Sequence, residues 1–198
     1  MQHGIDIEAL KKDENFQRDL AELERKMRVQ KSLDAGYKLL GMKLAIEANS
    51  DEINDIFTFL VNESFDILAD RLLEKRGFNL DDPEDLATIR AIYEHGLQRY
   101  SEKDLKGSKE IFLVLSHTID DNDLKDSMMI HACAVMAGYS FEEFIDKLVD
   151  SENIDYDSPT VFLIQSFTQP KEILLGMFSK YVNLANRELE VLKENKNI

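Results

Sequence analysis

The chain has 198 residues, of which 43% are hydrophobic, so it can fill a core of its own and wholesale disorder is disfavoured. Its formal net charge of −15 argues against binding to nucleic acid or to an anionic membrane surface. Only eight glycines and three prolines interrupt a sequence rich in Leu, Ile, Glu, Lys and Ala, which predicts an all-α fold.

Residues 6–48 have a helical pattern. Two apolar stripes follow one another, with a slip near residues 29–32: Phe16, Leu20, Leu23 and Met27, then Leu33, Tyr37, Leu40 and Leu44. We therefore predict an N-terminal helical arm over residues 1–49, which Gly36 and Gly41 can bend or divide. The stripes also suit a coiled coil, so a homodimer through this helix stays open.

A second helix is predicted from Asp51 to about Arg76, with Ser50 as its N-cap and Gly77 closing it. It begins a second all-helical domain over residues 50–198. Asp82 and Pro83 then start a third helix, because aspartate caps a helix and proline suits its first position. The shorter helices that follow are predicted over residues 83–102, 104–118, 121–137 and 141–150.

Ser140 and Glu143 form a capping box for the last of these helices. Residues 150–158 are polar and without periodicity, and are therefore predicted to be a loop. Pro159 and Pro170 are each expected to open a helix, over residues 161–167 and 171–193, and residues 194–198 are expected to fray.

The most informative stretch runs from Ile89 to Thr118 and predicts two antiparallel helices. Gly96 on the first helix and Ser108 on the second are small residues that let the two backbones approach. Another side of the first helix carries Tyr93, Leu97 and Tyr100, which we predict to line a partner-binding groove. A second unit extends the repeat-like core over residues 83–150 and adds Met129, Cys133 and Met136 to that groove.

The pattern Ile92-Tyr93-x2-Gly96-x3-Tyr100-x4-Leu105-x2-Ser108-x2-Ile111-Phe112-x2-Leu115 resembles the first tetratricopeptide repeat of the class II chaperones of type III secretion. The resemblance implies an acidic, helical, cytoplasmic protein that holds an exported polypeptide in a groove formed by Tyr93, Leu97 and Tyr100. It covers about 30 residues well. His95 and Arg99 stand where the general repeat prefers Leu and Tyr.

Each of these patterns has a plainer explanation. The Tyr93 and Tyr100 rings also suit core packing between neighbouring helices, as do the methionines around Cys133. Cys133 has no base beside it on a helix, since His131 is two residues away and points elsewhere. His3, His95, His117 and His131 are interpreted as single histidines at helix surfaces.

We expect no catalytic residues, no metal and no cofactor. The acidic run Asp120 to Asp123 lacks the glycine and glutamate of a calcium loop, and no phosphate-binding or nucleophile motif is present. Cys133 is the only cysteine, which suits a reducing cytoplasm. The first residues lack the features of a signal peptide, and no stretch is long and apolar enough to span a membrane.

The sequence thus predicts a non-catalytic protein-binding scaffold, a chaperone or adaptor, whose partner is another protein or an exported or assembling polypeptide. Two alternatives stay open. One is a structural component of a larger complex, such as a secretion apparatus or phage particle, that oligomerises through its N-terminal helix. The other is an enzyme of unrecognised class, whose distant active-site residues leave no local motif.

Overall fold

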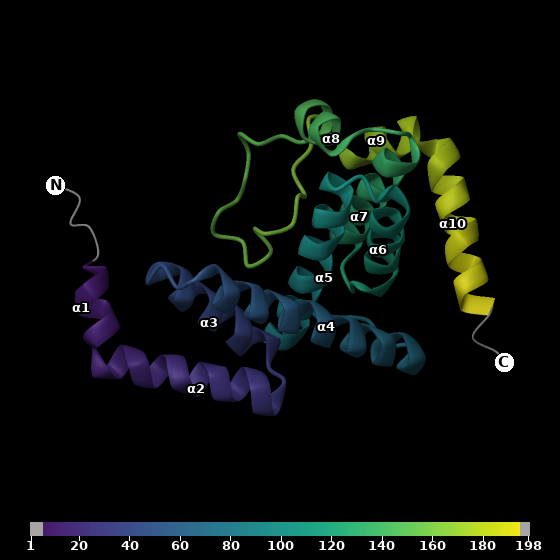
Figure 1. The fold of residues 1–198 in the computed structure, drawn as a ribbon. Helices are drawn as coiled ribbons and strands as arrows, with labels where there is room; N and C mark the ends of the chain where they lie inside the picture. Colours follow the sequence, from purple (N-terminus) through teal and green to yellow (C-terminus); the bar gives the residue numbers. More distant parts are fainter. Residues whose placement is uncertain (1–5, 195–198) are drawn as a thin grey trace. The chain divides into compact units, whose positions relative to one another are not determined.

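A computed structural model describes residues 6–194, and the all-α prediction is confirmed (Figure 1). Over these residues the helices are α1 (Ile7–Lys12), α2 (Glu14–Gln30), α3 (Leu33–Ala45), α4 (Ser50–Glu74), α5 (Pro83–Ser101), α6 (Leu105–Thr118), α7 (Asn122–Met136), α8 (Phe141–Leu148), α9 (Lys171–Met177) and α10 (Ser179–Glu194). None of these is long and apolar enough to cross a membrane. The expectations for residues 1–5 and 195–198 lie outside the described range.

The chain divides into two compact units, residues 1–68 and residues 69–198. The division falls within α4, whereas the sequence analysis placed a boundary at residue 49. Residues 50–68, most of α4, belong with the N-terminal helices, because Ile56 and Leu60 of α4 are buried in the first unit. The last residues of α4 belong with the second unit.

In the first unit the predicted helical arm consists of α1, α2 and α3, and it is divided at Asp13 and Lys31 rather than at Gly36 or Gly41. Asp13 ends α1 and caps α2, and Lys31 adopts a left-handed conformation with φ of 57° between α2 and α3. The Ser32 side chain then caps α3 by accepting a hydrogen bond from the Ala35 amide. Because the chain reverses there, α2 packs on α3, and the two apolar stripes bury Leu20, Met27 and other residues within the unit.

Gly36 marks the closest approach in the first unit. A Cβ atom there would lie 2.7 Å from Leu60 Cδ2 on α4 and 3.3 Å from Met27 Cγ on α2. Two local predictions for α4 are corrected. Asn49, whose side chain accepts a hydrogen bond from the Glu52 amide at 2.9 Å, caps the helix in place of Ser50. At the other end Lys75, with φ of 55°, takes the left-handed position that was assigned to Gly77.

Gly77 has a different role at the start of the second unit. The neighbouring Phe78 pairs with the end of α6, since its amide donates to the Thr118 carbonyl at 2.7 Å. A Cβ on Gly77 would lie 2.9 Å from that same oxygen, so only glycine fits without a shift. The segment is also fixed by an ion pair between Arg71 and the buried carboxylate of Asp85.

The predicted hairpin of α5 and α6 is confirmed. Asp82 caps α5 and Pro83 occupies its first turn, and α6 packs antiparallel against α5 after a short turn. Gly96 permits the close approach, but a Cβ at this position would meet Ile111 Cγ2 at 2.8 Å and Phe112 Cε1 at 3.1 Å rather than Ser108. The fold therefore uses the glycine as predicted, with a slightly shifted register.

The rest of the second unit builds on this hairpin. Helix α7 packs on α6, and α10 lies along both α6 and α7, where Lys109 pairs with Glu188 at 2.5 Å (Figure 1). The capping box of Ser140 and Glu143 at the start of α8 is confirmed. The predicted helix over residues 171–193 is divided into α9 and α10 at Phe178.

The predicted helix over residues 161–167 is wrong. Residues 149–167 form an irregular closed loop, whose ends are joined by the Asp150 amide donating to the Ser166 carbonyl at 3.0 Å and by a bridge between Val149 and Phe167. Within it, the Ser158 hydroxyl accepts from the Thr160 amide at 3.2 Å. Such local hydrogen bonds compete with the backbone hydrogen bonds of a helix. Pro159, on which the prediction of a helix was based, does not outweigh this effect.

Candidate functional site

The six predicted partner-binding residues differ in accessibility. Tyr93, Tyr100 and Cys133 are buried, with exposed fractions of 0%, 1% and 0%. The other three, Leu97, Met129 and Met136, are half-buried. The structure therefore does not bring the six together as one accessible surface.

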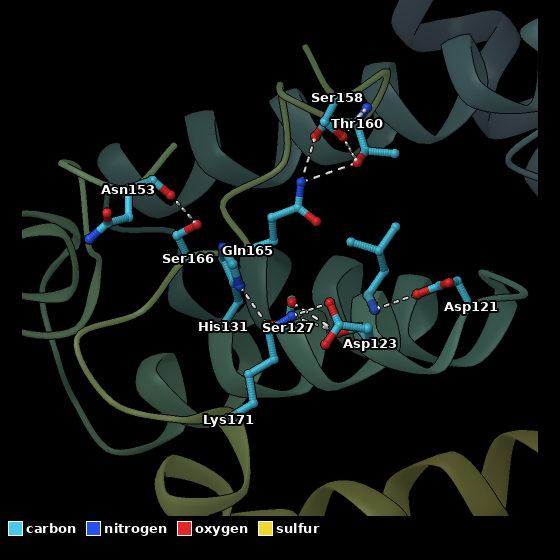
Figure 2. Close-up of polar contacts among 11 residues, drawn as sticks. Asp121, Asp123, Ser127, His131, Asn153, Ser158, Thr160, Gln165, Ser166 and Lys171 are labelled. Carbon is cyan, nitrogen blue, oxygen red and sulfur yellow. Dashed lines mark hydrogen bonds and ion pairs between the residues drawn. The ribbon is translucent and has the colours of Figure 1, made fainter. Parts of the chain in front are cut away.

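Tyr93 takes part in a buried hydrogen-bond chain across three segments. Its hydroxyl lies 3.0 Å from the Ile164 amide nitrogen and 3.0 Å from His131 Nε2, while His131 Nδ1 lies 2.7 Å from the Ser127 carbonyl (Figure 2 shows the last contact). A carbonyl only accepts, so Nδ1 carries the proton and Nε2 accepts from Tyr93. The chain runs from Ile164 N–H to Tyr93 O–H to His131 to Ser127.

The environment of His131 keeps the imidazole in this series of hydrogen bonds neutral. Burial lowers the pKa of His131 to about 4, against a weaker opposing effect of the hydrogen bond to Ser127. Four aromatic rings surround the imidazole, those of Tyr93, Phe112, Phe144 and Phe167. The interpretation of His131 as a surface histidine is therefore wrong, because its hydrogen-bond partners and the four neighbouring rings bury it completely.

Tyr100 is also bonded internally. Its hydroxyl donates to the Tyr139 carbonyl at 2.8 Å, and its ring contacts Phe112, Phe141 and Phe144 at centroid distances of 5.5 to 6.3 Å. Burial raises the pKa of Tyr100 and of Tyr93 above the usual value. Both phenols thus sit in the core as neutral groups.

The expectation of an open groove along Tyr93 and Tyr100 is accordingly corrected. The two tyrosines that were predicted to face a partner are covered by distant parts of the chain, Tyr93 by Ile164 and Tyr100 by α8. The pattern of apolar residues in one helix indicates that a face is apolar, but it does not indicate which segment covers that face. Partner contact by Leu97, Met129 and Met136 stays a prediction.

Cys133 offers no nucleophile in this arrangement. Burial raises the pKa of its thiol to about 12, so the thiol is protonated at neutral pH and the reactive thiolate is scarce. Among the side chains that the structure describes, no cluster of three or more His, Cys, Asp or Glu could hold a metal ion. The acidic start of α7 instead serves as a cap, with Asp121 accepting from the Leu124 amide at 2.8 Å.

A pocket of about 320 Å³ lies between the 149–167 loop and the start of α7. Its lining combines apolar and acidic side chains: Val149, Ile154, Val161, Leu163 and Ile164, with Asp123, Asp150, Asp155, Ser158, Gln165 and Ser166. The polar side chains of the loop bond to one another, as Figure 2 shows for Gln165 with Thr160 and for Ser166 with the Asn153 carbonyl. The loop therefore has a defined shape rather than a random one.

This pocket was not predicted from the sequence, although one signal for it was present. Between Lys147 and Lys171 the chain has no lysine or arginine, whereas Asp150, Glu152, Asp155 and Asp157 all lie in that interval. The pocket wall formed by Ile164 is fixed to the core by the Tyr93 hydroxyl. Hence the buried Tyr93 holds one wall of the pocket in position.

No protein-family model, no curated protein and no solved structure matches the chain. Function is therefore inferred from the geometry of the chain itself.

Proposed function

We propose that the chain is a non-catalytic protein-binding scaffold, a chaperone or adaptor, that holds a segment of a partner polypeptide against the 149–167 loop. The observation that carries this proposal is the apolar surface around the loop pocket. Ile154, Tyr156 and Val161 are 37%, 77% and 39% exposed, and Ile154 and Val161 also line the pocket.

Exposed apolar side chains beside a pocket are typical of surfaces that bind other proteins. Tyrosine is enriched at such interfaces because its ring provides contact area and its hydroxyl a hydrogen bond. The binding region thus differs from the α5 face that the chaperone resemblance implies. The kind of partner, an exported or assembling polypeptide in the cytoplasm, is retained from that resemblance and from the single cysteine.

Oligomerisation through the N-terminal helices is the weaker alternative. Leu20, Met27 and Leu33, which would form the seam of a coiled coil, are buried inside the first unit. Pairing with a second copy would then require this unit to open. An enzyme of unrecognised class remains the other alternative, and no group of residues in the described chain favours it.

The test uses three exposed positions and a matched control. Ile154, Tyr156 and Val161 are replaced together by serine, and in the control Ile173 and Met177, exposed residues of α9, are replaced by serine. A photoreactive phenylalanine analogue at position 156 of the full chain is irradiated in native lysate, and the adducts are identified by mass spectrometry. We expect a discrete adduct with one partner protein. This partner should bind to the wild-type chain and to the control variant but not to the triple variant.

Surface substitutions of this kind change stability by about 0.5 kcal/mol or less each, so loss of binding reflects the surface and not unfolding. Thermal unfolding of all three proteins by circular dichroism verifies this. Absence of any adduct, or equal capture by the triple variant, would contradict the proposal.

A further inference from the structure

We propose that the loop pocket receives a lysine or arginine side chain of the partner, so that the bound segment is basic as well as apolar. This inference rests on the proposed function, which it makes specific by naming the chemistry of the partner. It follows from three properties of the pocket: its apolar walls, its acidic groups and the lack of cations in the loop.

The walls suit the stem of a long side chain. Val149, Leu163 and Ile164 provide apolar surface within the pocket, and Ile154 and Val161 extend this surface to the exposed edge. Lysine and arginine place their methylene groups on apolar surface while the charged end reaches a polar partner. A small polar ligand would leave this apolar lining uncovered.

The acidic groups suit the charged end. Asp150 accepts hydrogen bonds from the Asn153 side chain at 2.7 Å and from the Glu152 amide at 3.1 Å. The Asn153 hydrogen bond in particular lowers the pKa of Asp150, so this carboxylate is ionised at neutral pH. Asp155 accepts from the Asp157 amide at 3.1 Å. Both carboxylates are therefore oriented by the loop before any partner binds.

Over residues 6–190, whose side chains the structure describes, these two carboxylates have no cationic partner. No lysine or arginine in that range forms an ion pair with Asp150 or Asp155, whereas Asp123 is paired with Lys171 at 2.5 Å (Figure 2). A cationic side chain in the pocket would thus meet these two carboxylates without displacing a lysine or arginine that is paired with either. An anionic ligand would be repelled, and so would a second copy of this chain, with its net charge of −15.

The test measures binding of short fluorescein-labelled peptides to the full chain by fluorescence anisotropy. One peptide alternates leucine with arginine, and in the other citrulline replaces each arginine, which keeps the shape and removes the charge. Asp150→Asn with Asp155→Asn removes the charges of these two carboxylates, keeps an acceptor oxygen at each position, and leaves Asp123 paired with Lys171. Glu110→Gln with Asp146→Asn, two exposed acids elsewhere in the second unit, removes the same total charge.

We expect the arginine peptide to bind at least about tenfold more tightly than the citrulline peptide, a difference of about 1.4 kcal/mol. The pocket variant should lose about that factor for the arginine peptide alone, since only the charge of the pocket is removed. The control variant should lose less than about twofold, because a net-charge effect between exposed groups is largely screened at physiological salt.

Three results would overturn the inference: equal binding of both peptides, an equal loss in the pocket and control variants, or binding of neither peptide. The proposed function has its own readout in the adduct at position 156. An adduct formed by a partner segment without basic residues would preserve the scaffold role and reject the basic anchor. The serine variant of Ile154, Tyr156 and Val161 separates the apolar contribution from the charge.

Discussion

The stability of the second unit should depend on pH through His131. The perturbation is a change of pH from about 7.5 to about 5, applied to the wild-type chain and to His131→Phe. Phenylalanine keeps a ring among the aromatic side chains around position 131 but carries no titrating nitrogen. It also leaves the Tyr93 hydroxyl without its acceptor, which costs about 1–3 kcal/mol at neutral pH.

The magnitude follows from the two protonation states. A histidine in an unfolded chain has a pKa of about 6.5, and burial lowers the pKa of His131 to about 4. The unfolded chain therefore takes up a proton first as the pH falls. The contribution to stability is complete above about pH 6.5 and is lost progressively down to about pH 4. Between about pH 7.5 and about pH 5 the loss amounts to about 2 kcal/mol.

The assay is urea unfolding at several pH values, followed by tyrosine fluorescence. Tyr37 is the only tyrosine outside residues 69–198, so the signal reports mainly on the second unit. Carboxylates that titrate in this range contribute equally to the free energies of unfolding of the wild type and of His131→Phe. Their contributions therefore cancel when the second free energy is subtracted from the first. The wild-type advantage should therefore shrink by about 2 kcal/mol as the pH falls.

His117→Gln is the matched control, since it removes an exposed histidine and leaves His131 in place, so the loss of stability attributed to His131 should persist in this variant. A constant difference between wild type and His131→Phe over the whole range would refute the reasoning. It would mean that the imidazole is accessible to protons in the folded chain.

Three further predictions concern the second unit and one comparison position. Asp85→Ala should lower the free energy of unfolding by about 3–5 kcal/mol, because Arg71 then lacks its carboxylate in a largely buried site; a loss below about 1 kcal/mol in urea unfolding would contradict this. Gly77→Ala should cost about 1–3 kcal/mol through its contact with a backbone oxygen. Gly41→Ala, which meets no atom within 4 Å, should instead gain up to about 1 kcal/mol, and equal melting temperatures would refute the contrast. Cys133 should react with iodoacetamide only as fast as the chain opens, and rapid labelling without urea would show that the thiol is accessible.

Local chemistry was sufficient to predict much of the fold. The caps at Asp82 and Ser140 are correct because a side chain that accepts from a nearby amide acts within a few residues. Gly96 identified the α5 and α6 hairpin because a missing Cβ allows two helices to approach. The helix wrongly predicted over residues 161–167 shows the limit, since the Ile164 amide donates to the Tyr93 hydroxyl, which lies far away in the sequence.

The sequence by itself determined that the chain is helical, acidic and able to form a core, because composition and periodicity act locally. Only the tertiary structure decided whether Tyr93 faces a partner or the interior, since Ile164, its hydrogen-bond donor, lies 71 positions away. The loop pocket depends on the same long-range contact. Periodicity records that one helix face is apolar, whereas the identity of the covering segment depends on how distant parts of the chain pack.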